Sequence, residues 1–222
     1  MKNNRILILT GGHISTQFVK EYLKVEEFTT IIAVDKGLLV ADNLNIPVNY
    51  VVGDFDSVPE QILNKYRNKS KNNNNFKIME FNPEKDATDT HIALKLAMDL
   101  EGDEIVILGG TGSRLDHTLA NIQLLREPLE KNIRTLILDE HNKIYLINSG
   151  MTFRKDKLFG DYISLLPYTE QVTNVTLEGF KYPLYNKTLI VGDSLGVSNE
   201  IISEEASILL DSGTLIVIES RD

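Results

Sequence analysis

Residues 51–60 read VVGDFDSVPE, and this stretch sets an apolar run directly in front of two carboxylates. The run ends at Gly53, and Asp54 and Asp56 follow with one residue between them. A near-continuous apolar run is typical of a strand covered on both faces, as the strands of parallel sheets are. The two carboxylates therefore lie where the strand leaves the core. Two interpretations are open for them: a polar turn closed by Pro59, or a metal site.

The same strand pattern recurs through about the first 140 residues, alternating with segments whose apolar residues are spaced by three and four. This alternation predicts βαβ units and a parallel sheet. The expected strands are RILILTGG (5–12), TTIIAVDKG (29–37), NYVVGDF (49–55), FKIMEF (76–81), EIVILGG (104–110) and RTLILDE (134–140). The expected helices are HISTQFVKEYLK (13–24), LLVADNL (38–44), PEQILNKYR (59–67), TDTHIALKLAMD (88–99) and LDHTLANIQLL (115–125), and NKSKNNNN (68–75) is expected to be a solvated loop.

After about residue 142 the pattern changes to short segments rich in Thr, Val, Ile and Tyr, separated by Gly, Pro, Asn and Asp. This predicts an all-β region, a small sandwich or barrel. We therefore expect an α/β protein: an N-terminal parallel-sheet α/β domain over residues 1–140, followed by a smaller all-β sandwich domain over residues 141–222. The expected strands are KIYLIN (143–148), MTFRKD (151–156), YISLLPY (162–168), VTNVTLEGF (172–180), KTLIVG (187–192) and GTLIVIES (213–220).

The composition excludes several classes of protein. With 42% hydrophobic and 25% charged residues over 222 positions, the chain is typical of a soluble globular protein. Its net charge of −9 argues against a nucleic-acid partner. No apolar run approaches the roughly 18 residues that span a membrane, and the N-terminal run is too short for a signal peptide. There is no cysteine, so disulfides and thiolate chemistry are absent. We expect a cytoplasmic protein.

Acidic residues follow several of the expected strands. Ligands of open parallel sheets bind beyond the carboxyl ends of the strands, and that edge would collect Asp35, Asp54, Asp56 and Asp89. Crowded carboxylates raise each other's pKa unless a cation holds them, and Mg²⁺ combines one or two carboxylates with substrate phosphates. Taken singly these residues have simpler interpretations: in DATDT, for example, Asp86 or Thr88 would cap a helix and Asp89 would face its dipole.

Phosphate-binding groups are expected at the same edge. GGTGSRLDH (109–117) is a glycine-rich turn that opens a helix, and Lys85 and Arg114 supply positive charge. A lone glycine cluster is more often a tight turn than a phosphate site. The sequence also lacks the P-loop pattern and the third glycine of G-x-G-x-x-G. Together, however, the carboxylates and the phosphate-binding groups indicate chemistry on a magnesium nucleotide.

The set GDFDS (53–57), DATDT (86–90), GGTGSRLDH (109–117) and SLGVSNE (194–200), in this order, resembles the bacterial thiamine pyrophosphokinases, and the resemblance covers essentially the whole chain. It implies an enzyme that transfers diphosphate from ATP to thiamine, giving thiamine diphosphate and AMP, with Mg²⁺. It further implies that residues 1–140 form the ATP- and magnesium-binding catalytic domain and residues 141–222 the thiamine-binding sandwich. The family forms homodimers, and we expect the active site at the subunit interface.

The resemblance also implies roles for single residues. Asp54, Asp56 and Asp89 would bind the metal, and Asp89 or Asp56 would accept the hydroxyl proton of thiamine. Read alone, GVSNE is a hairpin turn; by resemblance it carries the thiamine contacts Ser198 and Asn199, with Glu200 next. The chain has no tryptophan to stack on the thiamine ring. The implied catalytic residues are Asp54, Asp56, Asp89, Lys85 and Arg114, and the implied nucleotide-binding residues are Asp35, Gly110, Thr111, Arg114, Asp116 and His117.

Two other functions stay open on the residues alone. A magnesium-dependent nucleotide phosphohydrolase would use the same carboxylates but would leave the SNE segment without a task. A non-catalytic sensor of nucleotide or thiamine would bind its ligands and form no AMP.

Overall fold

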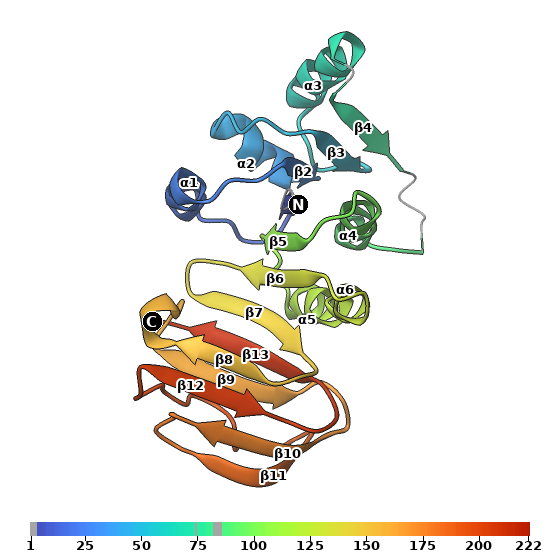
Figure 1. Ribbon diagram of the computed structural model, residues 1–222. Coiled ribbons are helices and arrows are strands. Elements are labelled where there is room, and N and C mark those ends of the chain that lie inside the picture. Colours follow the sequence, from blue (N-terminus) through green and yellow to red (C-terminus); the bar gives the residue numbers. More distant parts are fainter. Residues whose placement is uncertain (1–3, 74, 82–85) are drawn as a thin grey trace. The chain divides into compact units, whose positions relative to one another are not determined.

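The computed structural model describes residues 4–73, 75–81 and 86–222. The chain divides into two compact units, Met1–Glu140 and His141–Asp222 (Figure 1). Among the described residues, no helix is both long enough and apolar enough to cross a membrane.

The first unit is built on a parallel sheet. Its strands lie in the order β4-β3-β2-β1-β5-β6, and every neighbouring pair runs parallel. The central strands are buried almost throughout, as their continuous apolar runs predict. The predicted parallel α/β fold is thus confirmed. The strands are β1 (Arg5–Leu9), β2 (Thr30–Val34), β3 (Tyr50–Gly53), β4 (Lys77–Glu80), β5 (Glu104–Leu108) and β6 (Arg134–Leu138).

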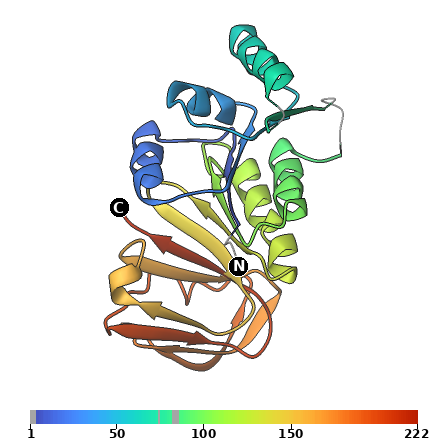
Figure 2. The same cartoon turned by 45° about the horizontal axis from the view of Figure 1, so that its top comes forward.

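Helices cover both faces of this sheet: Figures 1 and 2 show α1 on one face and α4 and α5 on the other. The prediction was wrong in two places. Residues 68–72 continue the third helix, where a loop was expected, and a short helix with Pro128 in its first turn follows the fifth. Proline is tolerated there because first-turn N–H groups have no partner within the helix. The helices are α1 (Thr16–Val25), α2 (Gly37–Asn43), α3 (Glu60–Asn72), α4 (Asp89–Asp99), α5 (Leu115–Leu124) and α6 (Arg126–Glu130).

The order of the strands creates a switch point between β1 and β5. The chain builds outward from β1 through β2 and β3 to β4, and then returns to the other side of β1 as β5. Connections leave the sheet in opposite directions at such a point, and ligands of open α/β sheets bind there, beyond the carboxyl ends of the strands.

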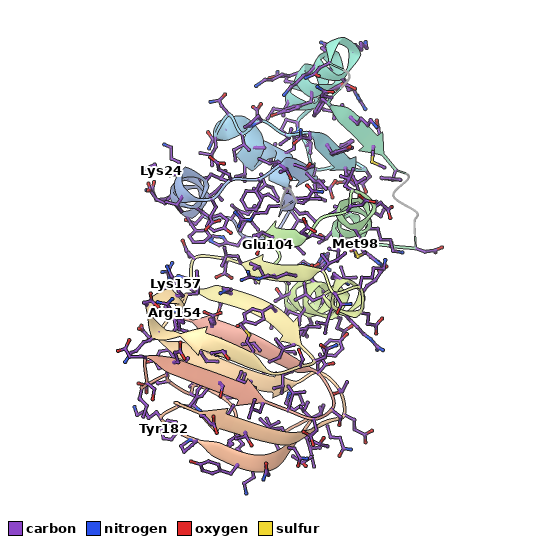
Figure 3. All side chains as sticks on the ribbon, viewed as in Figure 1. Lys24, Met98, Glu104, Arg154, Lys157 and Tyr182 are labelled. Atoms are coloured by element: carbon purple, nitrogen blue, oxygen red, sulfur yellow. The ribbon has the colours of Figure 1, made fainter. Side chains whose placement is uncertain are left out.

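Ion pairs link the strands at their amino ends, on the side of the sheet away from this point. Glu104, the first residue of β5 (labelled in Figure 3), is 2.7 Å from Nη2 of Arg5 and 3.0 Å from Nη1 of Arg134. Arg5 also pairs with Glu26 at 2.7 Å. The charges at these strand ends therefore neutralise one another, and their role is structural.

The second unit contains two antiparallel sheets, ordered β7-β13-β9 and β11-β10-β12-β8. Strand residues alternate between buried and accessible, as in strands with one face on a shared core. This confirms the predicted smaller all-β domain, although the strand at residues 205–209 was missed. The elements are β7 (Asn142–Ile147), β8 (Met151–Arg154), a 3₁₀ turn (Lys155–Lys157), β9 (Tyr162–Pro167), β10 (Gln171–Glu178), β11 (Leu184–Ile190), β12 (Glu205–Leu209) and β13 (Leu215–Ser220).

The core of the second unit also holds one charged side chain. Glu219 on β13 is only 1% exposed. Its carboxylate accepts hydrogen bonds from Lys143 Nζ (2.7 Å), the hydroxyl of Tyr145 (3.0 Å) and the backbone N–H of Phe159 (2.8 Å). The buried charge is both paired and hydrogen-bonded, which is the condition under which proteins tolerate one.

Candidate active site

A cleft of about 1390 Å³ opens at the carboxyl ends of the parallel strands of the first unit. It spans the β1–β5 switch point, and each of the strands contributes to it through the residues that follow it. Its lining consists of residues 10–13 after β1, Asp35 and Lys36 after β2, Asp54, Asp56 and Ser57 after β3, residues 86–90 before and within α4, residues 109–114 with His117 and Asn121 after β5, and Asp139 after β6.

The GDFDS turn presents its two carboxylates by burying the residue between them. Phe55 is 4% exposed and has a left-handed backbone conformation, φ 61°. With this ring in the core, Asp54 and Asp56 on either side line the cleft. The N–H of Asp56 donates to Oδ1 of Asp54 at 3.1 Å, which sets the turn. The segment is thus a turn, as its simpler interpretation held, and a turn whose carboxylates face a cleft.

Asp35 lies against this turn from the neighbouring strand. Its Oδ1 is buried and has no hydrogen-bond partner among the described residues. Burial, followed by the charges of Asp89 and Asp54, raises the pKa of Asp35 to about 7. A hydrogen bond between Asp35 and Asp89 contributes in the same direction, because it requires a proton on one of the two carboxyls. Carboxylates from three separate connections therefore meet at one point.

This cluster fits a cation that takes few ligands from the protein. Among the residues described, no group of three or more His, Cys, Asp or Glu side chains is placed to hold a metal ion. Oxygen donors are nevertheless gathered here, one of them a buried carboxylate oxygen with no hydrogen-bond partner in the described part of the chain. Hard divalent ions such as Mg²⁺ bind in this way, through one or two carboxylates with water and phosphate oxygens completing the shell.

The start of α4 contains both the N-cap of the helix and an acidic residue of the carboxylate cluster. The hydroxyl of Thr88 accepts the N–H of His91 at 3.3 Å, so Thr88 is the N-cap. Asp89 is the first residue of the helix and interacts with Asp35. The hydroxyl of Thr90 lies 2.6 Å from that of Thr10 at the end of β1, and both residues are buried. This bond ties the acidic helix start to the glycine turn after β1.

The glycine turns after β1 and β5 are in direct contact. A Cβ on Gly12 would lie 2.2 Å from the carbonyl oxygens of both Gly109 and Thr111, so only glycine fits at this position. The N–H of Gly12 donates to Gly109 O at 3.0 Å, and that of His13 to Thr111 O at 2.8 Å. Main-chain atoms of the two turns therefore form one wall of the cleft.

Arg114 and His117 line the cleft beside this wall. Nη2 of Arg114 is 2.6 Å from Asp116 Oδ2, and both side chains are exposed. The hydrogen bond from Arg114 lowers the pKa of Asp116 to about 2. Exposed ion pairs contribute little stability because solvent screens them, so the guanidinium is able to exchange this partner for another anion. Asp116 itself is not among the lining residues.

The predicted thiamine residues belong to the second unit. Asn199 is 4% exposed and is held on both sides: Nδ2 donates to Tyr182 O at 2.8 Å, and Oδ1 accepts the N–H of Tyr182 at 3.0 Å. Ser198 is exposed with φ 55°, and its N–H donates to Ser164 Oγ at 3.0 Å. Glu200 pairs with Lys181 at 2.6 Å. Asn199 thus shapes the segment, and Ser198 is the exposed side chain of the pair.

The structure brings most of the predicted α/β site residues together and adds others. Lys85 lies outside the described residues. Lys36 and Asp139 line the cleft and were not predicted, although both follow strands and the strand-end rule identifies them. Asn121 also lines the cleft. It lies within a helical pattern, where the sequence carries no signal for it.

Carboxylates and a glycine-rich turn that line one cleft at the carboxyl ends of a parallel sheet are typical of α/β proteins that bind phosphorylated ligands. Comparison with known proteins identifies this chain further. Residues 22–137 match the model of the thiamin pyrophosphokinase catalytic domain, and residues 150–215 match that of the thiamin pyrophosphokinase vitamin B1 binding domain.

Single relatives agree with the family models. Thiamine pyrophosphokinase of Bacillus subtilis is 36% identical over 89% of this chain and 90% of its own length. The crystal structure of the B. subtilis enzyme superposes with a TM-score of 0.85 at 34% identity, covering 99% of this chain and 100% of that chain. That of Geobacillus thermodenitrificans thiamin pyrophosphokinase gives 0.84 at 29% identity, with 98% of each chain covered. The chain belongs to the thiamin pyrophosphokinase family, whose enzymes are diphosphotransferases that act on ATP and thiamine.

Proposed function

We propose that the cleft of the first unit binds the triphosphate of ATP and delivers its β-phosphorus to the hydroxyl of thiamine. The hydroxyl oxygen forms a new bond to the β-phosphorus, the bond between this phosphorus and the α–β bridging oxygen breaks, and AMP leaves. The observation that carries this proposal is the joint lining of one cleft by Asp54, Asp56, Asp89 and the glycine turn at residues 109–112. Such transfer depends mainly on positioning and on neutralisation of charge.

In this proposal Asp54, Asp56 and Asp89 would supply carboxylate oxygens to Mg²⁺, although among the described residues no three such side chains are placed to hold an ion before it binds, and Asp35 would interact with Asp54 and Asp89. When bound, the ion supplies positive charge to the phosphate oxygens. Two observations support this assignment: the buried oxygen of Asp35 has no hydrogen-bond partner within the residues that the structure describes, and three connections converge here. The hydroxyl proton of thiamine passes to Asp89 or Asp56, both of which line the cleft.

Arg114, His117 and the glycine turn complete the phosphate site. Arg114 and His117 face the same cleft, and the backbone of Gly110 and Thr111 forms its wall. Arg114 exchanges Asp116 for a phosphate oxygen, which leaves Asp116 to orient the guanidinium between turnovers. Lys85, which lies outside the described residues, completes the set by its resemblance to the family pattern.

We assign thiamine to the second unit, at the segment that carries Ser198 and Asn199. The match of residues 150–215 to a vitamin B1 binding domain supports this assignment. Exposed apolar side chains at Val191, Leu195 and Val197 lie close in sequence to Ser198, and apolar side chains that form one contiguous exposed patch mark an interface. We therefore propose a homodimer in which each active site joins the cleft of one subunit to the thiamine segment of its partner. A monomer with full activity in sedimentation analysis would contradict this assembly.

The reaction is tested by its products. The purified protein is incubated with ATP, Mg²⁺ and thiamine, and nucleotides and thiamine esters are separated by chromatography. We expect AMP and thiamine diphosphate in equal amounts, and neither product without thiamine. ADP would show attack at the γ-phosphorus instead. Release of phosphate without thiamine would identify a nucleotide phosphohydrolase, and binding without AMP would identify a sensor.

A further inference from the structure

The turn after β5 is held by hydrogen bonds to its own carbonyl oxygens. Gly109 O accepts the N–H of Gly12 at 3.0 Å, and Thr111 O accepts the N–H of His13 at 2.8 Å. Between them, Gly110 O accepts Nδ2 of Asn121 at 2.8 Å. The first two donors are backbone groups. The Asn121 amide is a side chain, so it can be removed by substitution.

These bonds fix the direction of the amide groups on the other side of each peptide. In a trans peptide the C=O of one residue and the N–H of the next point in opposite directions. The N–H groups of residues 110–112 therefore point away from Gly12, His13 and Asn121. Within the described part of the chain, they donate no hydrogen bond to a protein acceptor. They belong to a turn that lines the cleft.

Asn121 acts on the Gly110–Thr111 peptide from a buried position. Its side chain comes from α5 and is 7% exposed. Gly110 also packs against β6, since a Cβ there would lie 2.8 Å from Ile137 Cγ2. The hydroxyl of Thr111 donates to Asp139 Oδ2 at 2.7 Å. Without the Asn121 donor, the buried Gly110 carbonyl loses its partner, and rotation of the peptide towards another donor turns the Thr111 N–H out of the cleft.

We propose that Asn121 is a positioning residue for the diphosphate transfer: its side-chain amide holds the Gly110–Thr111 peptide so that the Thr111 N–H faces a phosphate oxygen of ATP. This inference rests on the proposed binding of the ATP phosphates in the cleft. It assigns the effect of Asn121 to the nucleotide and not to thiamine, because the amide that it orients belongs to the wall formed by the glycine turns.

Two variants test this role. Asn121→Leu keeps the approximate size of the side chain, adds no charge to the cleft and removes the donor to the Gly110 carbonyl. Asn121→Ser keeps a polar group that is too short to reach it. Binding of α,β-methylene-ATP, which is not cleaved at the reacting bond, is measured by calorimetry with Mg²⁺. We expect each variant to bind this analogue about 10-fold more weakly, the effect of about one lost hydrogen bond. The KM for ATP rises with it, and the KM for thiamine stays unchanged.

Asn4→Leu is the matched control. Nδ2 of Asn4 donates to Leu100 O at 2.7 Å and to Glu101 O at 3.0 Å, so this variant also removes asparagine–carbonyl bonds, but just before β1, at the end of the sheet away from the cleft. It should lower thermal stability and leave analogue binding unchanged. If both Asn121 variants lose stability as this control does and still bind the analogue as tightly as the unsubstituted protein, the positioning role is overturned. If the unsubstituted protein itself does not bind the analogue, the placement of ATP in this cleft fails, and this inference fails with it.

Discussion

Asp35 and Gly53 are packed so closely that a Cβ on residue 53 would lie 1.9 Å from Oδ1 of Asp35. The absence of a side chain at Gly53 therefore provides the space for the one buried carboxylate oxygen that has no hydrogen-bond partner among the described residues. The glycine that ends β3 serves the acidic cluster and not only the turn.

Gly53→Ala should accordingly displace Asp35 or the GDFDS turn. Misplacement of catalytic groups by about 1 Å costs on the order of 100-fold in rate, so we expect a loss of that size in turnover at saturating ATP and thiamine. Gly150→Ala is the control, because a Cβ there meets nothing closer than Ile208 O at 3.2 Å. Turnover of Gly53→Ala equal to that of the control would show that Asp35 tolerates displacement.

The pKa of Asp35 predicts how the stability of the metal-free protein depends on pH. It is raised from the ordinary value of 3.8 to about 7 in the folded state. The stability contributed by its protonated form is therefore complete below pH 3.8 and is lost as the pH rises through 7. In EDTA, urea unfolding should show a drop of roughly 1–2 kcal/mol between pH 5 and pH 8, less than the full linkage value because the group is partly solvated.

Asn at this position accepts the left-handed backbone of Asp35 and does not titrate. The Asp35→Asn variant should therefore lack this drop in the free energy of unfolding. Parallel pH profiles for the two proteins would mean that the carboxyl keeps its ordinary pKa. Added Mg²⁺ should stabilise the unsubstituted protein more at pH 8 than at pH 5, because the ion binds the ionised carboxylates.

The hydroxyl pair of Thr10 and Thr90 should behave as one unit. Either single valine substitution leaves a buried hydroxyl without its partner, at a cost of about 1–3 kcal/mol in the free energy of unfolding. The double variant Thr10→Val/Thr90→Val removes both groups and should cost clearly less than the sum of the two. Additive losses in urea unfolding would show that the 2.6 Å contact carries no coupling.

Ser198 and Asn199 should differ in what they affect. Asn199→Ala removes a buried amide that bonds both backbone groups of Tyr182, so we expect the second unit to lose about 2–3 kcal/mol of stability. Ser198→Gly keeps the positive φ and removes an exposed hydroxyl. It should leave stability almost unchanged and raise the KM for thiamine. An unaltered KM in Ser198→Gly would remove this hydroxyl from the thiamine site.

The sequence predicted the structure best in segments where a single residue pattern determines the local fold. Continuous apolar runs located the parallel strands, and polar residues after them located Asp54 and Asp89. β12 was missed because Ala206 and Ile208 are its only fully buried residues, set between Glu205 and Ser207. The end of α3 was missed because its asparagine-rich composition predicts a loop, whereas extending a helix that has already formed is easier than starting one.

The contacts between residues of the site could not be predicted from the sequence, for a different reason. The proximity of Asp35 to Gly53, or of Asn121 to Gly110, depends on which turns the sheet brings together. The switch point between β1 and β5 decides that, and local residue patterns do not encode strand order. In the sequence, Asn121 cannot be distinguished from any other polar residue of an amphipathic helix. Only the fold brings its amide to the Gly110 carbonyl.

The central claim is that Asp54, Asp56 and Asp89 bind one divalent ion together with the ATP phosphates. Electron paramagnetic resonance of Mn²⁺, used in place of Mg²⁺, tests it directly in the presence of α,β-methylene-ATP. Adding the unsubstituted protein should change the spectrum of the complex between Mn²⁺ and the analogue. The Asp54→Asn and Asp89→Asn variants should not produce this change. Asp99→Asn, at the other end of the helix that begins with Asp89, should retain it. If Asp54→Asn and Asp89→Asn gave the same spectrum as the unsubstituted protein, these carboxylates would not be the metal site.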